Sequence, residues 1–133
     1  MKTKSIKQTI AFNCKPIEIY SLLMNSKTHA ALTGGKASIS KKINGKFSAF
    51  DGYCHGYNIE LIEGEKIVQA WHFAEEGWPK DHYSICTFLF EQAKNGTKLT
   101  FHQTNIPEHK VEDLKNGWKE FYWQPIKSYF MKK

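Results

Sequence analysis

The side chains of this chain that could perform chemistry are six histidines and three cysteines. They are His29, His55, His72, His82, His102, His109, Cys14, Cys54 and Cys86. None of their spacings matches a metal-binding or redox motif. The adjacent pair Cys54 and His55 would point to opposite faces of a strand and could not share a metal. The sequence therefore predicts no metal site, no cofactor and no disulfide, with free thiols in a reducing compartment.

Nucleophilic catalysis would need a nucleophile, a base and an orienting group that converge in space. Cys54, Cys86, His72 and His102 all lie on predicted strands, so a Cys–His pair inside a cavity is geometrically possible. Nothing in the spacing requires such a pair, and buried cysteines are common core residues. No glycine-rich loop follows a strand and opens a helix, as phosphate binding would need. We expect a protein that is not an enzyme.

The chain carries a net charge of +6, from 19 lysines and 13 acidic residues, and contains no arginine. The missing arginine argues against sequence-specific nucleic-acid binding, because the guanidinium group makes the commonest specific contact to bases. A basic chain can instead bind an acidic protein surface. We therefore expect an acidic protein partner and no nucleic acid.

A length of 133 residues suits a single domain, spanning 1–133, that folds without disulfides or metal. No apolar run approaches the roughly 18 residues that a membrane helix needs. The first eight residues are charged and lack the apolar core of a signal peptide. The expected protein is a cytoplasmic monomer that does not bind membranes.

The first third of the chain predicts a strand followed by two short helices. Ile6, Ile10 and Phe12 alternate with polar residues, as in a half-buried strand. Pro16 then opens a helix, since proline is favoured in the first helical turn. A second helix over residues 27–32 should end at Gly34, because glycine commonly terminates helices.

From residue 37 to about residue 104 the sequence predicts an antiparallel meander. Apolar and polar residues alternate in short segments. The turn sequences Asn44-Gly45, Asp51-Gly52 and Asn95-Gly96 separate several of these segments. The predicted strands cover residues 37–41, 47–50, 53–62, 66–73, 83–90 and 98–104. Short turns between consecutive strands form an antiparallel sheet rather than a parallel α/β sheet.

The last segment, after Pro107, predicts one long helix with a broad aromatic face. The apolar residues recur every three or four positions, at Leu114, Trp118, Phe121, Tyr122, Pro125, Ile126, Tyr129 and Phe130. Pro125 should kink this helix, because it lacks a backbone donor and crowds the preceding turn. The order of elements predicts an α+β fold of the helix-grip type. In this fold a curved antiparallel sheet wraps around a long C-terminal helix, and two short helices follow the first strand.

Several segments, taken in order, resemble one known family. They are Gly45-Lys46-Phe47, Asp51-Gly52, the strand from Lys66 to Phe73 with Trp71, Trp78-Pro79, Asn95-Gly96-Thr97, Asn116-Gly117-Trp118 and Phe121-Tyr122-Trp123. Together they resemble the C-terminal domain of the activators of heat shock protein 90 ATPase, over roughly residues 6–130. The resemblance implies a START-like (SRPBCC) helix-grip fold. Nothing in the chain resembles the N-terminal domain of the eukaryotic co-chaperones, so we expect a stand-alone domain.

A curved sheet that grips a helix commonly encloses a cavity. The candidate ligand contacts are Trp71, Phe73, Phe88, His102, Trp118 and Tyr122, with Phe90 and Phe101 beside them. Gln69, His102 and Gln103 could orient a ligand there, or they could face solvent. The aromatic side chains could equally fill a solid core, and the sequence leaves both interpretations open.

The loop with Trp78 and Pro79 offers a candidate surface for a protein partner. An exposed tryptophan beside a rigid proline could be a contact hot spot. Lys36, Lys46 and Lys80 could steer an acidic partner toward it. The loop could instead tuck over the mouth of the cavity.

The resemblance implies a co-chaperone-like domain that docks on a heat shock protein 90 chaperone. Such a domain would stimulate the chaperone's ATPase by binding its competent conformation more tightly than its open one. The alternative is a binder or carrier of a small hydrophobic ligand, with the terminal helix as a lid. An enzyme that uses the same cavity is the third possibility.

Overall fold

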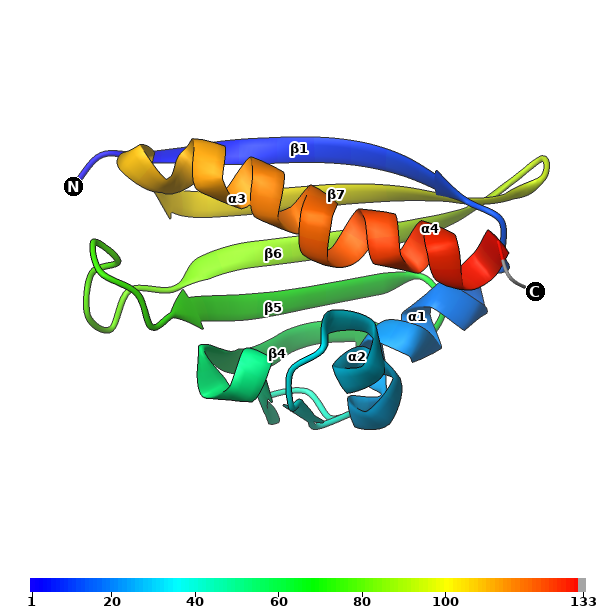
Figure 1. The fold of residues 1–133 in the computed structure, drawn as a ribbon, viewed down its shortest axis with the longest axis horizontal. Helices are drawn as coiled ribbons and strands as arrows, with labels where there is room; N and C mark the ends of the chain where they lie inside the picture. Colours follow the sequence, from blue (N-terminus) through cyan, green and yellow to red (C-terminus); the bar gives the residue numbers. More distant parts are fainter. Residues whose placement is uncertain (132–133) are drawn as a thin grey trace.

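The computed structural model describes residues 1–131, which form one curved, seven-stranded antiparallel sheet with helices on one face (Figure 1). The strand order is β1-β7-β6-β5-β4-β3-β2. Within the described residues the strands are β1 (Thr3–Phe12), β2 (Ser38–Ile39), β3 (Lys46–Ala49), β4 (Cys54–Ile62), β5 (Lys66–Phe73), β6 (Ser84–Ala93) and β7 (Gly96–Pro107). This arrangement confirms the expected α+β helix-grip fold.

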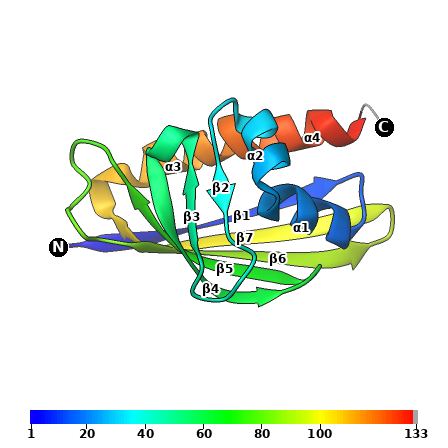
Figure 2. The same ribbon diagram turned by 90° about the horizontal axis from the view of Figure 1, so that it is seen from below.

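The helical elements gather on the concave face of the sheet (Figure 2). Within residues 1–131 they are α1 (Pro16–Met24), α2 (Ser26–Thr33), α3 (Val111–Trp118) and α4 (Gln124–Met131), with 3-10 turns η1 (Phe50–Gly52) and η2 (Glu108–Lys110) and a π-helical segment η3 (Lys119–Trp123). The segments α3, η3 and α4 follow one another as a single long helix. In Figure 1 this helix crosses the sheet diagonally, from β1 at its start to α1 and α2 at its end.

The ends of the two short helices form as the sequence predicts. Pro16 occupies the first turn of α1. The Asn25 side chain accepts hydrogen bonds from the backbone N–H groups of Lys27 and Thr28, at 2.9 and 3.1 Å, and so caps α2. Gly34 ends α2 with a φ of 84°, a conformation that glycine adopts without steric cost.

A turn of π-helix lies immediately before Pro125, the residue at which the sequence predicted a kink. The backbone N–H of Gln124 donates to the carbonyl of Lys119, five residues back. Proline lacks an N–H group and its ring would crowd the carbonyl four residues before it, that of Phe121. The wider turn accommodates the proline, and it also brings the consecutive residues Tyr122 and Trp123 into the buried interface with the sheet.

The strand boundaries differ from prediction at the β6–β7 hairpin and near β2 and η1. The predicted strands 83–90 and 98–104 are longer in the structure, where β6 runs to Ala93 and β7 from Gly96 to Pro107. β2 contains only two residues, because the carbonyls of Ser40 and Lys42 accept hydrogen bonds from the buried Asn58 side chain instead of a neighbouring strand. Asp51-Gly52 does not form the simple hairpin turn that we expected. Phe50 and Asp51 both adopt positive φ values within η1, and the Asp51 N–H donates to the Lys36 carbonyl.

One half of the space between helix and sheet is filled by aromatic side chains. Trp118 lies with its ring centre 4.4 Å from that of Phe101 and 5.9 Å from that of Phe88. Trp123 stacks beside Trp118 at 5.7 Å. We call this cluster of Phe88, Phe101, Trp118 and Trp123 the packed half. All four side chains are buried, so no space for a ligand remains among them.

A glutamine on the sheet accepts a hydrogen bond from the indole N–H of three of the four buried tryptophans. Trp118 donates to Gln103 at 2.7 Å, Trp71 donates to Gln69 at 2.9 Å, and Trp123 donates to Gln8 at 2.7 Å. Gln103 donates in turn to Ser84, and Gln69 donates to Asn58. Burying an unpaired polar group is unfavourable, so these bonds set the position of each ring.

Candidate functional site

A pocket of about 460 Å³ lies between the first half of the long helix and the corner where β4 begins and β5 ends. It is lined by Phe50, Tyr53, Cys54, Trp71, Phe73, Glu75, Asp113, Leu114, Gly117, Trp118, Phe121 and Tyr122. Seven of these twelve residues are aromatic. Tyr53, Phe121 and Asp113 are exposed, so the pocket opens to solvent beside them. We call this region the open half of the interior.

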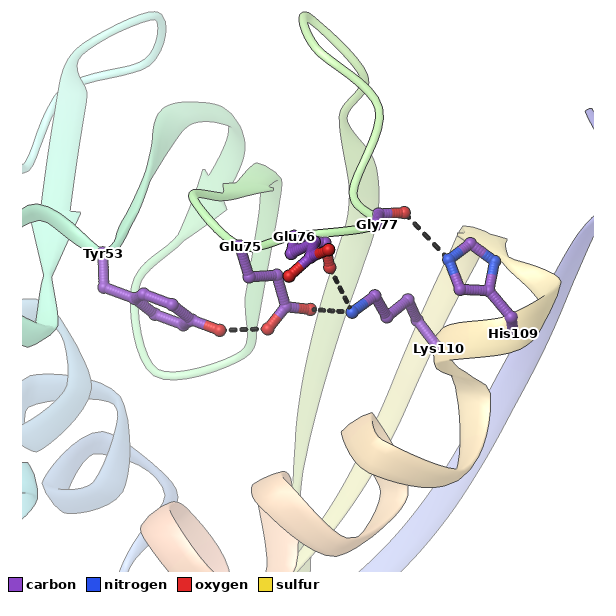
Figure 3. Close-up of polar contacts among 6 residues, drawn as sticks. All are labelled: Tyr53, Glu75, Glu76, Gly77, His109 and Lys110. Atoms are coloured by element: carbon purple, nitrogen blue, oxygen red, sulfur yellow. Dashed lines mark hydrogen bonds and ion pairs between the residues drawn. The ribbon is translucent and has the colours of Figure 1, made fainter.

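A network of polar contacts ties three elements together at the rim of this pocket (Figure 3). The Tyr53 hydroxyl, at the corner before β4, donates to the carboxylate of Glu75 in the β5–β6 loop. The Lys110 ammonium, at the end of η2, lies 3.4 Å from the other oxygen of Glu75 and donates to the Glu76 carbonyl at 2.7 Å. His109 Nε2 donates to the Gly77 carbonyl at 2.8 Å. These contacts hold the mouth in one shape.

The electrostatics of the rim are acidic on balance. Desolvation, the hydrogen bond to Glu75 and the nearby carboxylates of Glu75 and Asp113 raise the pKa of Tyr53. The hydroxyl therefore remains a hydrogen-bond donor at neutral pH. Both carboxylates belong to residues that line this pocket.

The two strand cysteines are unsuited to catalysis. Cys54 lines the pocket and Cys86 lies fully buried beneath it, and burial raises the pKa of both thiols. A thiol that stays protonated is a weak nucleophile. His72 and His102 lie on the outer face, across the sheet from these cysteines, so the Cys–His pair that strand positions allowed does not form.

Four of the six candidate ligand contacts line the pocket: Trp71, Phe73, Trp118 and Tyr122. Phe88 instead belongs to the packed half. The prediction that His102 lines the cavity is wrong. His102 lies between Phe101 and Gln103 on β7, and both of these neighbours face the helix, so His102 faces outward.

The candidate hot spot at Trp78 is not formed, because the exposed arrangement, one of the two that the sequence left open, does not occur. Its side chain is only 6% exposed and packs on Phe73, with ring centres 4.8 Å apart. Its indole N–H donates to the His82 carbonyl at 2.8 Å. The loop therefore folds back on the end of β5, which is the alternative that the sequence left open. A buried tryptophan cannot be a contact hot spot for a partner.

The three candidate lysines are exposed but lie on separate elements. Lys36 lies between α2 and β2, Lys46 begins β3, and Lys80 lies in the β5–β6 loop. Lys46 pairs across the strands with Tyr57 on β4. Of the three, Lys46 therefore has an exposed aromatic neighbour on the outer face of the sheet.

The outer face of the sheet carries an aromatic and histidine cluster that sequence reasoning did not single out. His55 and His72 face each other across β4 and β5, with ring centres 4.9 Å apart. Tyr83 packs against both rings, and Tyr57 packs on Tyr83 at 5.7 Å. Desolvation and the nearby His72 lower the pKa of His55. Within residues 1–131, no three His, Cys, Asp or Glu side chains gather to hold a metal ion.

Sequence reasoning missed the residues at the mouth of the pocket. Tyr53, Glu75, Asp113 and Gly117 come from three separated segments, and no local pattern joins them. The available signal was Gly117 itself, a glycine inside an otherwise helical stretch, where this residue type is unfavourable.

Known structures of the same architecture place the chain in a class of helix-grip domains. A Chromobacterium violaceum protein matches with a TM-score of 0.79 at 20% identity, over 95% of this chain and 96% of that one. A structure described as a heat shock protein 90 activator from Plasmodium falciparum matches with a TM-score of 0.85 at 30% identity, over 94% of each chain. The fold is therefore START-like.

The particular family follows from sequence. The family model described as "Activator of Hsp90 ATPase homolog 1-like protein" matches residues 13–131, and the chain belongs to this family. The Dictyostelium discoideum activator homolog is 33% identical over 96% of this chain, and the human activator homolog 1 is 29% identical over 95%. The chain spans 33% and 36% of the length of these two relatives, about a third of each.

No helix within residues 1–131 has the length and apolar character needed to cross a lipid bilayer.

Proposed function

We propose that this chain is a docking domain for a heat shock protein 90 chaperone and that it stimulates the ATPase of that chaperone. Family membership over residues 13–131 carries this proposal. The domain would act by binding the ATPase-competent conformation more tightly than the open one, since a ligand shifts an equilibrium only through such a difference in affinity. The net charge of +6 favours an acidic patch on the partner.

The docking surface that we propose is the outer face around Tyr57 rather than the loop around Trp78. Tyr57 is 39% exposed, pairs with Lys46, and packs on the half-buried Tyr83 just before β6. Tyrosine is enriched among interface hot spots. Lys46 adds a positive charge beside it, while Lys36 and Lys80 would contribute only at longer range.

An amide NMR titration with the chaperone from the same source tests this proposal. We expect shifts on the outer face that include Lys46, His55 and Tyr57, together with a rise in ATPase rate. Tyr57→Ala should weaken binding by about 1–2 kcal/mol, as removal of a hot spot does. Tyr129→Ala is the matched control, because Tyr129, at the far end of the long helix, has a similar exposure of 46%.

Two results would contradict the proposal. The first is an absence of shifts at about 100 μM chaperone, where even weak complexes are visible. The second is binding that Tyr57→Ala leaves intact while Tyr129→Ala weakens it, which would move the docking surface to the helix. A cytoplasmic location, a monomeric state and the lack of enzymatic activity remain predictions.

A second function, the binding of a small apolar ligand, is favoured by the pocket itself. Its volume of about 460 Å³ falls in the range of small-molecule sites, and its walls are mainly aromatic. Mass spectrometry of organic extracts from the purified protein tests this function. A molecule retained in near-stoichiometric amount would support it. An empty extract, with no change in tryptophan fluorescence on addition of apolar probes, would contradict it.

A further inference from the structure

We propose, on the basis of the ligand-binding function above, that the pocket accepts an amphipathic monovalent cation. Its apolar body would lie among the aromatic rings, and its ammonium group would lie at the rim beside Asp113 and Glu75. Three independent features support this ligand class: the charge of the lining, the aromatic character of the mouth, and a glycine that keeps the space open.

The charge of the lining is opposite to that of the chain. The protein has 19 lysines and a net charge of +6, yet the lining contains no lysine and no histidine. Its two charged residues are Glu75 and Asp113. A fatty acid or another anion would meet carboxylates at the mouth, whereas an ammonium group would be attracted by them.

The two carboxylates are not equivalent. Glu75 is already engaged on both oxygens, by the Tyr53 hydroxyl and by Lys110 at 3.4 Å. Asp113 forms no ion pair and no side-chain hydrogen bond within residues 1–131. Its charge remains available to a ligand. Asp113 is therefore the main partner of the cation, and Glu75 acts chiefly in holding the rim together.

The rings at the mouth suit a cation as well as an apolar body. Phe121 is 47% exposed and Tyr53 is 40% exposed, so both present ring surface beside the carboxylates. Ammonium groups are attracted to aromatic faces, more strongly where water is partly excluded. Deeper in the pocket, Trp71 and Trp118 lie with ring centres 5.2 Å apart and offer only apolar surface to a ligand.

Gly117 keeps this space open. It lies in α3 and lines the pocket, and a Cβ atom built on it would meet nothing within 4 Å. Glycine destabilises a helix relative to alanine. No close approach of the backbone requires glycine here, unlike at Gly56, where a Cβ would lie 1.7 Å from the Ala70 carbonyl oxygen. The missing side chain therefore serves the pocket rather than the packing.

A matched series of eight-carbon probes tests the proposal: octylammonium, 1-octanol and octanoate. Fluorescence of Trp71 and Trp118 reports binding, and amide NMR shifts around Gly117 locate it. At low salt we expect octylammonium to bind at least about tenfold more tightly than octanoate, with octanol between them. Raising the salt concentration should reduce the preference, because Asp113 is exposed and its charge is screened.

Charge-neutralising variants assign the preference to one residue. Asp113→Asn should remove most of the preference for octylammonium and leave octanol binding unchanged. Glu112→Gln is the matched control. It removes the same charge from the adjacent residue, which does not line the pocket. An equal effect of both variants would indicate attraction by the general surface charge and would overturn the role of Asp113.

A pocket-filling variant separates the failure of this inference from the failure of ligand binding itself. Gly117→Leu should abolish binding of all three probes, and Gly117→Ala should weaken it if the leucine variant does not fold. Equal affinities for the three probes, or tighter binding of octanoate, would overturn the cation inference while ligand binding stands. An absence of binding by every probe would overturn both.

Discussion

The two halves of the space between sheet and helix are built from the same residue types, but one half is filled with side chains and the other contains a pocket. In the packed half, Phe88, Phe101 and Trp123 surround Trp118 and leave no room for another molecule. In the open half, the same helix and the segment formed by η1 and the end of β5 enclose a pocket of about 460 Å³. Trp118 belongs to both halves, and Tyr122, which lines the pocket, packs on it with ring centres 4.7 Å apart.

The two halves also differ in where their hydrogen bonds lie, and this difference affects how much each half contributes to stability. Each indole in the packed half has a glutamine partner, the buried Gln103 or the half-buried Gln8, so its position is determined by hydrogen bonding as well as by packing. The open half has few such bonds inside and keeps its polar contacts at the rim. Removal of side chains should therefore destabilise the first half strongly and the second half weakly.

The largest expected effect is that of Phe101→Ala, which should lower the free energy of unfolding by about 3–5 kcal/mol. Phe101 is 0% exposed and contacts Phe88, Trp118 and Trp123. Phe121→Ala is the matched change in the open half and should lower stability by less than about 1 kcal/mol, since that ring is 47% exposed. Urea denaturation of both variants measures the contrast. Similar losses would mean that the open half is also part of the core.

The second largest expected effect is a pH dependence of the free energy of unfolding. It originates at His29, on the α2 side of the packed half. Burial lowers the pKa of His29 to about 4, and its Nε2 lies 2.9 Å from the Tyr122 hydroxyl. Its Nδ1 has no hydrogen-bond partner within residues 1–131. The unfolded chain binds a proton at this residue below pH 6.5, and the folded chain does so only near pH 4.

The neutral His29 therefore contributes stability that is present above pH 6.5 and is lost as the pH falls toward 4. The loss should reach about 3 kcal/mol at pH 4, from 1.36 kcal/mol for each unit of pKa shift. Chemical denaturation between pH 7 and pH 4 measures it. His29→Gln should show a shallower decline across this window, and parallel curves for the two proteins would exclude His29 as the origin.

Gln103→Leu should have the third largest effect, a loss of about 1–3 kcal/mol. The leucine leaves the Trp118 N–H without its acceptor at 2.7 Å and Ser84 without its donor at 2.9 Å. Thermal unfolding measures the stability, and the tryptophan emission spectrum should broaden as the ring loses its fixed position. A neutral effect would show that packing alone positions Trp118.

Gly117→Ala should have the smallest effect, and its sign should be opposite. The methyl group enters empty space and improves helix propensity, so the variant should gain about 1 kcal/mol in stability. It should also bind 1-octanol more weakly than the parent protein. A loss of stability in chemical denaturation would mean that Gly117 has a packing role after all.

Much of the architecture could be predicted from local patterns. Alternation in residues 66–73 predicted β5 with the bounds that the structure shows, and Pro16 and Gly34 marked the ends of α1 and α2. The aromatic repeat after Pro107 predicted the long helix, although Pro125 led to an expected kink where a π-turn forms. Local propensity does not distinguish a kink from a π-turn, because either one relieves the clash between the Pro125 ring and the Phe121 carbonyl.

Fewer of the site residues could be predicted from the sequence. Trp71 and Trp118 were expected at the cavity from their positions on strand and helix, and they line it. His102 was assigned to the wrong face, because a shift of one residue in the expected alternation reverses the direction of a strand side chain. Whether Trp78 is exposed or tucked against the domain was left open, because burial of a loop tryptophan depends on how the loop folds back, here onto Phe73.

By itself the sequence determined the order of elements, the antiparallel meander, the aromatic face of the last helix and the family, because these depend on periodicity and turn chemistry along the chain. Only the tertiary structure decided which part of the interior is filled and which is hollow. That outcome depends on how far the helix stands from each strand. It therefore depends on contacts between residues as distant in sequence as Tyr53, Glu75 and Gly117, which no local pattern encodes.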